Sequence, residues 1–230
     1  MMTASGKPVT ERKLRKRAER KARILAAAEE LILSKGYAST TIDDIAARAD
    51  VSKGAVYLHY RTKEDIFFSI TCKGLEVLSE MFREGAGKQT EGLEKFKAIG
   101  YSFYEFNVRY PGYAKLLFDE NLPNPSQELD SVQKCRALNE EIGSIMVSSI
   151  ELGKNDGSIR PEVDALAAAL IISSSMQGLV RTMQSQRELM ETRGLESRQL
   201  VDYAIDLYGR SLMNALKGPI HQKAAVAKKK

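Results

Sequence analysis

The side chains best suited to surface chemistry lie in one short basic and aromatic segment, and they are hydrogen-bond donors and small residues rather than nucleophiles. Lys53 can donate to the O6 and N7 acceptors of guanine, whereas Gly54 and Ala55 permit close approach or contact with a thymine methyl group. Val56 and Tyr60 take the inward positions of the same short helix. The outward face therefore suits the major groove of DNA; the alternative is the solvated face of an ordinary helical hairpin.

A short helix just upstream must help to hold that segment in place. Thr41 is followed three residues later by Asp44, which is the spacing of a capping box at a helix start. Apolar residues then recur at helical spacing and predict an inward face. These residues are Ile42, Ile45, Ala46 and Ala49.

A tight turn and two further helix starts follow within a few residues. Ser52 is placed to cap the next helix, and Val51 and Val56 have the spacing of a hydrophobic staple. Thr62, three residues before Asp65, is placed to cap a third helix. The segment therefore predicts a helix-turn-helix followed directly by a connecting helix.

This ordered pattern resembles the DNA-binding domain of TetR-family transcriptional regulators from about Arg23 to Phe67. The family usually has glycine in the turn, where this chain has Asp50. A left-handed backbone costs Asp about 1 kcal/mol relative to glycine, so we expect the turn to be kept. The matching positions are Gly36-Tyr37, Thr41-Ile42, Ile45-Ala46, Val51-Ser52-Lys53-Gly54, Val56-Tyr57, His59-Tyr60 and Lys63-Glu64.

The resemblance implies an all-α fold of about nine helices. In it, an N-terminal three-helix helix-turn-helix domain is joined by a continuous helix to a larger helical ligand-binding and dimerisation domain. The resemblance also implies phosphate contacts from Tyr57, His59 and Lys63, and from Thr41 at the start of its helix. The full set of expected DNA-binding residues is Thr41, Ser52, Lys53, Gly54, Ala55, Tyr57, Leu58, His59 and Lys63.

Helix breakers and charge divide the chain into segments. We expect a partly disordered basic arm at residues 1–19, the helix-turn-helix domain at 20–66, the larger domain at 67–218 and a disordered basic tail at 219–230. Pro161 is expected at the first position of its helix. The later helices are predicted at about 63–83, 91–110, 111–118, 126–152, 161–191 and 197–217.

The net charge of +5 is unevenly distributed, because residues 7–23 contain nine Lys or Arg and only two Glu. A basic surplus suits an anionic partner. This arm could follow the minor groove or the backbone of DNA, or it could be a disordered solubilising tail, and both interpretations stay open. The C-terminal Lys228-Lys229-Lys230 is interpreted as a tail.

Methionine and aromatic residues are spread over the helices of the larger domain. For any one of them core packing is the favoured interpretation, but together they suit an adaptable apolar pocket. The TetR resemblance implies that a small apolar or amphipathic inducer binds there, with polar contacts from Tyr104, Asn107 and Gln177. The expected ligand-binding residues are Phe82, Phe103, Tyr104, Asn107, Phe118, Met146, Met176 and Gln177.

The last two long helices carry apolar stripes that are too wide for a one-sided core contact. Such stripes predict an isologous four-helix interface between two copies of the chain. The alternative is a well-buried core of a monomer. The expected interface residues are Leu166, Leu170, Ser174, Val201, Ile205, Tyr208 and Leu212.

Several other kinds of site lack support in the sequence. The run Gly85-Ala86-Gly87-Lys88 fails as a phosphate loop, because Phe82 stands where the first glycine is needed. The chain has only two histidines, His59 and His221, so a His-based metal site or catalytic triad is not expected. We predict no cofactor and no enzymatic activity.

The remaining features favour a cytoplasmic protein. Cys72 and Cys135 lack metal-ligand or redox spacing and are interpreted as reduced, partly buried thiols. The N-terminus lacks the apolar core of a signal peptide. The most apolar run, residues 165–172, is too short to span a bilayer, so no membrane partner is expected.

The sequence therefore predicts a homodimeric regulator that binds a pseudo-palindromic double-stranded DNA operator. Its two recognition helices would enter major grooves about one helical turn apart, or a multiple of it. Most regulators of the resembled family are repressors, so we expect an inducer to release the protein from DNA. The alternative is an architectural or partner-regulated DNA-binding protein without a small-molecule ligand.

Overall fold

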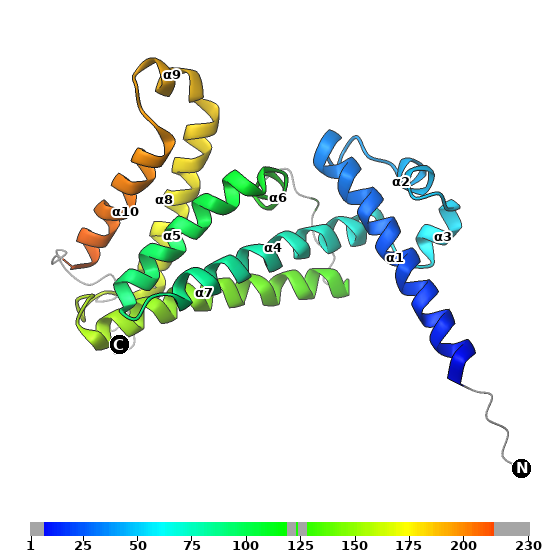
Figure 1. Cartoon of the computed structure of the whole chain (residues 1–230), viewed down its shortest axis with the longest axis horizontal. Coiled ribbons are helices and arrows are strands. Elements are labelled where there is room, and N and C mark those ends of the chain that lie inside the picture. Colours follow the sequence, from blue (N-terminus) through cyan, green and yellow to red (C-terminus); the bar gives the residue numbers. More distant parts are fainter. Residues whose placement is uncertain (1–6, 119–122, 124–127, 214–230) are drawn as a thin grey trace, which may run out of the picture. The chain divides into compact units, whose positions relative to one another are not determined.

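The computed structural model describes residues 7–118, 123 and 128–213, and these residues form helices, turns and loops without any β-strand (Figure 1). The prediction of an all-α fold is therefore confirmed. The helices are α1 (Lys7–Lys35), α2 (Ile42–Arg48), α3 (Lys53–Tyr57), α4 (Lys63–Gly87), α5 (Gly92–Arg109), α6 (Pro111–Leu117), α7 (Asp130–Asp156), α8 (Ala165–Ser185), α9 (Arg187–Thr192) and α10 (Ser197–Met213).

Several helix boundaries differ from the prediction. Helix α4 continues through Gly85 and Ala86 to Gly87, so its predicted end at about residue 83 is wrong. Helix α7 continues to Asp156, because it ends only where Gly157 adopts a left-handed backbone (φ 81°). Helix α8 begins at Ala165, because the carboxylate of Asp164 accepts a hydrogen bond from the Ala167 N–H (2.9 Å), so the predicted start at Pro161 is wrong. A break at Gln186 then separates α8 from the short α9, which the prediction had merged with it.

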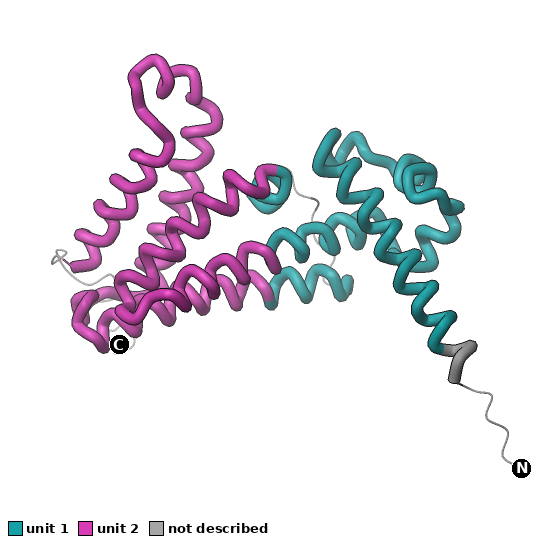
Figure 2. The backbone as a smooth tube through the Cα atoms, in the orientation of Figure 1, with its two compact units in different colours: residues 1–75, 112–137 teal, residues 76–111, 138–230 magenta. Residues whose placement is uncertain are grey.

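Backbone contacts divide the chain into two compact units (Figure 2). Unit 1 comprises residues 1–75 and 112–137, and unit 2 comprises residues 76–111 and 138–230. The division falls inside α4, so this helix is one unbroken element with residues in both units, as expected from the absence of a linker. The first residues of the predicted arm (1–6) and the whole predicted tail (219–230) lie outside the described residues.

The core of unit 1 supports the short helix α3. Helix α2 packs against both α1 and α3. The side chains of Val56 and Tyr60 are 0% and 2% exposed, so they anchor α3 and its C-terminal end from inside. A helix of five residues is not stable alone. Its position therefore depends on this buried side and on the neighbouring helices.

The first half of α4 is held by other helices of unit 1. Glu29 of α1 accepts a hydrogen bond from the Tyr113 hydroxyl of α6 and forms an ion pair with Lys73 of α4. The start of α7 is tied to α4 as well, since the Ser131 hydroxyl donates to Asp65 (2.8 Å). The buried thiols of Cys72 and Cys135 lie next to each other at this contact, with sulfur atoms 2.6 Å apart.

Unit 2 is a helical bundle in which α5 packs against α8 and α10. Phe106 of α5, Ile150 of α7 and Val201 of α10 are each fully buried. Helix α5 approaches α7 so closely at Gly92 that an added Cβ would lie 1.9 Å from the backbone nitrogen of Gly153. Only glycine fits this crossing, and the crossing sets the position of α5.

Candidate functional site

All three predicted helix caps of the helix-turn-helix are present. Thr41 and Asp44 form a reciprocal capping box, with the Asp44 N–H donating to Thr41 Oγ1 (3.1 Å) and the Thr41 N–H donating to Asp44 Oδ2 (2.9 Å). Ser52 Oγ accepts from the Ala55 N–H (3.2 Å), and Thr62 Oγ1 accepts from the Asp65 N–H (3.2 Å). These local bonds define where α2, α3 and α4 begin.

The charge of the capping box is reinforced from α1. Lys35 Nζ donates to Asp44 Oδ2 (2.8 Å). This contact and the hydrogen bonds to Thr41 lower the pKa of Asp44 to about 2. The carboxylate therefore stays ionised, and it caps α2 over the whole physiological pH range.

The turn between α2 and α3 contains the predicted left-handed residue. Asp50 has φ 51°, and it is the one residue other than glycine with a positive φ in the part of the chain that the structure describes. The turn is closed by hydrogen bonds from the Asp50 N–H to Ala47 O (3.2 Å) and from the Val51 N–H to Ala46 O (3.0 Å). Asp therefore holds the geometry that glycine usually supplies in this position.

The outward face of α3 and of the residues after it is open to solvent. Lys53 and Gly54 are exposed, and Tyr57 and Leu58 are 49% and 74% exposed. Lys53 Nζ lies 2.9 Å from Asp43 Oδ2, and this pair raises the pKa of Lys53. An ion pair between two exposed side chains is worth little. Lys53 can therefore exchange Asp43 for a stronger acceptor.

Lys63 lies at the start of α4 in a more restrained setting. Its ammonium group is 4.1 Å from the ring centroid of Tyr37, whose hydroxyl donates to Glu64 (3.0 Å). Burial lowers the pKa of Lys63. The contact with the ring directs the charge and leaves its hydrogen-bond donors available to an anion.

The N-terminal half of α1 reaches the end of α3, which the sequence analysis did not foresee. The two helices line a groove of about 450 Å³. The sequence did contain a signal for this groove. The basic residues of α1 that line it have the i, i+3, i+4, i+7 spacing of one helix face. The lining residues, here called the cationic groove, are Lys13, Lys16, Arg17, Arg20, Leu58 and His59.

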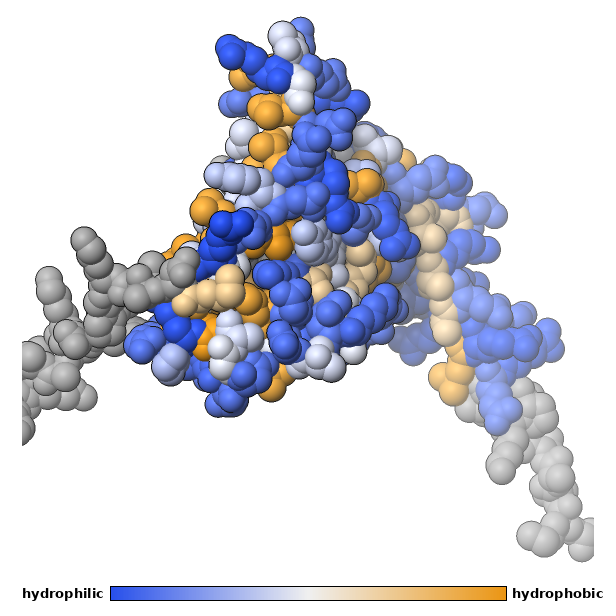
Figure 3. Space-filling model, turned by 60° about the vertical axis from the view of Figure 1, so that its left-hand side comes forward, coloured by the Kyte–Doolittle hydropathy of each residue, from blue (hydrophilic) through white to orange (hydrophobic). Residues whose placement is uncertain are grey.

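His59 shows the electrostatic effect of this arrangement. Its pKa is lowered, first by burial and then by the positive charges of Arg17, Arg20 and Lys21. The imidazole is therefore neutral at pH 7, in a positive field. In Figure 3, the N-terminal half of α1, beside the grey tail at the right, is covered mainly by hydrophilic side chains.

Residues 24–70, from α1 into α4, match the family model of the bacterial regulatory proteins of the tetR family. The matched segment contains the caps, the left-handed turn and the exposed α3 described above. This segment of the chain is therefore a helix-turn-helix of the TetR-family type. The basic N-terminal half of α1 precedes the matched residues.

The chain is also similar to a curated relative and, in its fold, to solved structures. The uncharacterized regulator YerO of Bacillus subtilis is 34% identical over 116 residues, which are 48% of this chain and 39% of YerO. The chain thus spans well under half of the length of that relative. Bacillus subtilis FadR in complex with stearoyl-CoA is 21% identical, with a TM-score of 0.64 over 81% of this chain and 96% of that one. AibR in complex with isovaleryl coenzyme A and operator DNA is 21% identical. Its TM-score is 0.61, and the match covers 82% of this chain and 97% of AibR.

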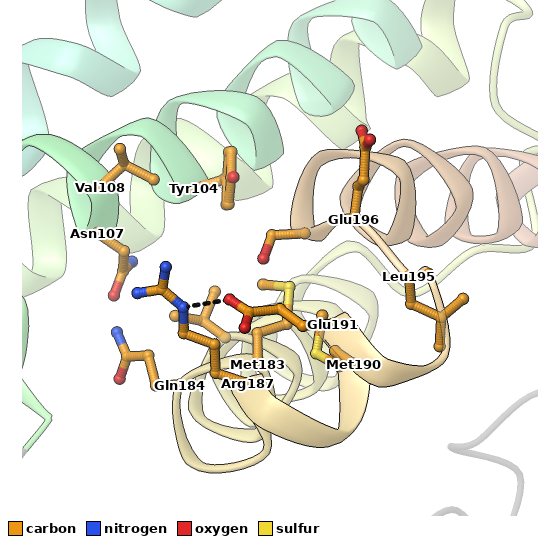
Figure 4. A pocket seen from close by; sticks show the side chains of 13 residues that line it. Tyr104, Asn107, Val108, Met183, Gln184, Arg187, Met190, Glu191, Leu195 and Glu196 are labelled. Carbon is orange, nitrogen blue, oxygen red and sulfur yellow. Dashed lines mark hydrogen bonds and ion pairs between the residues drawn. The ribbon is translucent and has the colours of Figure 1, made fainter.

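Unit 2 contains a pocket of about 670 Å³ between α5, the end of α8, α9 and the start of α10 (Figure 4). Met183 and Met190 supply an apolar side, whereas Arg187 pairs with Glu191 (Nε to Oε1, 2.8 Å) on a polar side. The lining residues, here called the unit 2 pocket, are Tyr104, Asn107, Val108, Val180, Met183, Gln184, Arg187, Met190, Glu191, Gly194, Leu195, Glu196 and Ser197.

The expected ligand-binding residues are divided by the structure. Tyr104 and Asn107 line the unit 2 pocket, and the Asn107 amide donates to Phe103 O (2.8 Å). The other members of the expected set do not line this pocket: Phe82, Phe103 and Met176 are buried, Met146 and Gln177 are half-buried, and Phe118 belongs to unit 1. Sequence reasoning missed the contribution of α9, because it did not resolve α9 as a separate helix.

The expected interface residues are likewise divided. Leu166 and Leu170 on α8 are 60% and 59% exposed, and Ser174 is exposed on the same helix. On α10, Val201, Ile205 and Leu212 are buried within the chain and Tyr208 is half-buried. The outward face of α10 instead carries the exposed Tyr203 and Leu207.

Helix α8 is also the one described helix whose length and apolar composition would suit a membrane span. Its inner face, which includes Ala169, Ile172 and Met176, is buried in unit 2. Of the apolar stretch of α8, 22% is buried inside the chain. Leu166 and Leu170 lie on the exposed side of the same helix.

Proposed function

We propose that this TetR-family chain is a homodimeric transcriptional regulator that binds DNA in a sequence-specific manner and is controlled by a small amphipathic ligand. The observation that supports DNA binding best is the exposed face of α3, which is presented on a capped helix-turn-helix with a left-handed turn. Two copies of α3 enter major grooves about one helical turn apart, or a multiple of it, on a pseudo-palindromic operator.

The contacts divide into base readout and positioning. Lys53 reads a guanine, and Gly54 and Ala55 allow α3 to lie close to the base edges. Thr41 and Lys63 bind backbone phosphates from the starts of their helices. The proposed DNA-binding surface also includes Ser52, Tyr57, Leu58 and His59.

Selection of bound sequences from a random duplex library tests this function. The expected result is enrichment of an inverted repeat, which follows from the two-fold symmetry of a dimer. A library that shows no enrichment after repeated rounds, with a folded protein, would count against sequence-specific binding.

The ligand proposed for the unit 2 pocket combines an apolar part with a polar or anionic head group. Met183, Met190 and Val180 suit an apolar chain, because methionine adapts its shape to its neighbours. Arg187 and Asn107 offer donors to a carboxylate, phosphate or thioester oxygen. The acyl-CoA bound in FadR and in AibR supports acyl thioesters as the first class to test.

Thermal unfolding of the protein with acyl-CoA esters of increasing chain length tests the ligand. A ligand at about 100 times its dissociation constant stabilises the native state by about 2.7 kcal/mol. Free coenzyme A is the matched control for the head group. An absence of stabilisation by acyl-CoA esters and fatty acids would favour an architectural or partner-regulated protein.

The regulatory coupling is proposed to run through α4, since this unbroken helix contains Lys63 near one end and residues of unit 2 at the other. A ligand that binds the non-operator conformation better would reduce DNA affinity by no more than its differential affinity for the two states. In this scheme the protein is a repressor, and the ligand is its inducer.

A further inference from the structure

Helix α1 extends on its N-terminal side beyond the segment that matches the family model. It begins at Lys7, whereas the family match begins at residue 24. Residues 7–23, here called the α1 extension, therefore add about 25 Å of helix at 1.5 Å per residue. Nine of these residues are Lys or Arg. A continuous helix gives the basic side chains from Arg12 to Arg23 fixed directions, which a disordered tail would not.

Four of the basic residues share one face of the extension. Lys13, Lys16, Arg17 and Arg20 have i, i+3, i+4 and i+7 spacing, and all four line the cationic groove. Like charges at these spacings repel each other and weaken an isolated helix. The lining contains no acidic residue in the described part of the chain. An anion in the groove would remove this repulsion.

The opposite wall of the groove comes from the recognition element. Leu58 and His59 follow α3 directly, and Leu58 is 74% exposed. The groove is thus next to the face that meets DNA in the proposed function. A duplex seated on α3 would bring its backbone phosphates to this position, with one phosphate per strand for every base pair.

We propose that the cationic groove binds a backbone phosphate of duplex DNA beside the bases read by α3, so that the α1 extension is a second DNA-binding element. This proposal rests on the proposed DNA-binding function and adds a contact outside the matched family segment. The groove contributes affinity and orientation without base readout, because its donors meet phosphates only.

Two double variants with equal loss of charge test the proposal. Lys16→Ala/Arg17→Ala removes charge from the groove, whereas Arg12→Ala/Arg15→Ala removes the same charge from two positions of this helix that do not line it. Arg15 pairs with Glu19 (3.3 Å) and does not line the groove. Alanine favours helix, so circular dichroism should show equal helix content for both variants.

The measurement is the dissociation constant of the full chain for a mixed-sequence duplex of about 30 base pairs at several KCl concentrations, because each phosphate contact contributes about 0.9 to the salt slope. The groove variant should reduce the slope by about 0.9, as expected for the loss of one phosphate contact. It should weaken binding about fivefold at 150 mM KCl. The control variant should change the slope by less than about 0.5.

The possible outcomes separate this proposal from the proposed function. Equal effects of the two variants would show a dependence on net charge alone and overturn the groove site, as would the absence of any effect. Loss of salt-dependent binding in Lys63→Ala, with no change in the groove variant, would support DNA binding and reject the groove.

Wild-type protein that fails to bind duplex DNA would instead reject the proposed function. Loss of binding to phosphatidylserine vesicles, with DNA binding unchanged, would assign the groove to a membrane and overturn the proposal.

Discussion

At the scale of single residues, local polar contacts were the most predictable part of the site. The caps by Thr41, Ser52 and Thr62 depend on side chains that bond within three residues, so the sequence alone contains both partners. The environment of His59 was not predictable, because the charges that act on it come from a distant part of α1. Helix caps are thus determined by nearby residues in the chain, whereas the pKa of a side chain such as His59 also depends on residues far away in sequence.

His59 is expected to make DNA binding dependent on pH. The imidazole is mainly neutral in the free protein at pH 7, since burial and nearby cations lower its pKa below 6.5. A DNA phosphate beside it favours the protonated form, so the complex takes up a proton and affinity should increase as pH falls from 8 to 5.5. The dissociation constant measured across this range should fall more steeply for the wild type than for His59→Gln. Equal pH profiles would remove His59 from the phosphate contacts.

Lys53 and Lys63 should differ in what their loss changes. Lys63→Ala should weaken binding to all sequences alike and lower the salt slope by about 1, as expected for a phosphate contact. Lys53→Ala should cost about 1–3 kcal/mol on the preferred operator and relax selection at one base pair. Competition binding with a set of operator variants distinguishes the two roles. If Lys63→Ala relaxed the sequence preference and Lys53→Ala weakened binding to all sequences alike, Lys63 would be the residue that reads a base and Lys53 the phosphate contact.

At the scale of helices, periodicity predicted which elements exist, but close packing and caps decided where they end. The break at Gln186 and the cap by Asp164 altered the ends of α8, and they formed the short α9 that lines the unit 2 pocket. A Pro at a favourable first position did not start the helix, since the side-chain cap three residues later was satisfied instead.

The turn before α3 offers a test of backbone strain. Asp50→Gly should raise the stability of unit 1 by about 0.5–1 kcal/mol, because glycine adopts φ 51° without steric cost. Asp50→Ala should lower it by a similar amount, as alanine tolerates this backbone less well than Asp. Urea titration of both variants measures the difference. Equal midpoints would mean that the turn stores no strain.

The crossing of α5 and α7 offers a test of packing. Gly92→Ala should destabilise unit 2 by about 1–3 kcal/mol, because the new methyl group would overlap the backbone at Gly153. Gly143→Ala is the matched control within α7, where an added Cβ has no neighbour within 4 Å and should stabilise the helix by about 0.5–1 kcal/mol. A tolerated Gly92→Ala would show that the two helices can separate without cost.

At the scale of the whole molecule, two copies of the chain are expected to meet through the outward faces of α8 and α10. Leu170→Glu should convert the dimer to a monomer in sedimentation at micromolar concentration, because it places a charge at the centre of an apolar contact. Leu14→Glu, at a residue with the same 60% exposure as Leu166 but in unit 1, should remain dimeric. A wild-type protein that sediments as a monomer would remove the dimer from the proposed function.

The sequence by itself determined the helical class, the capped helix-turn-helix and the family resemblance, because these depend on residues that are close together in the chain. Only the tertiary structure decided which face of α10 is covered by α5, which residues line the unit 2 pocket and where the α1 extension meets α3. A stripe such as Val201, Ile205 and Leu212 is equally suited to a core or to an interface until its neighbour is known. Such choices depend on contacts between residues far apart in sequence, whose positions are fixed by packing rather than by local preference.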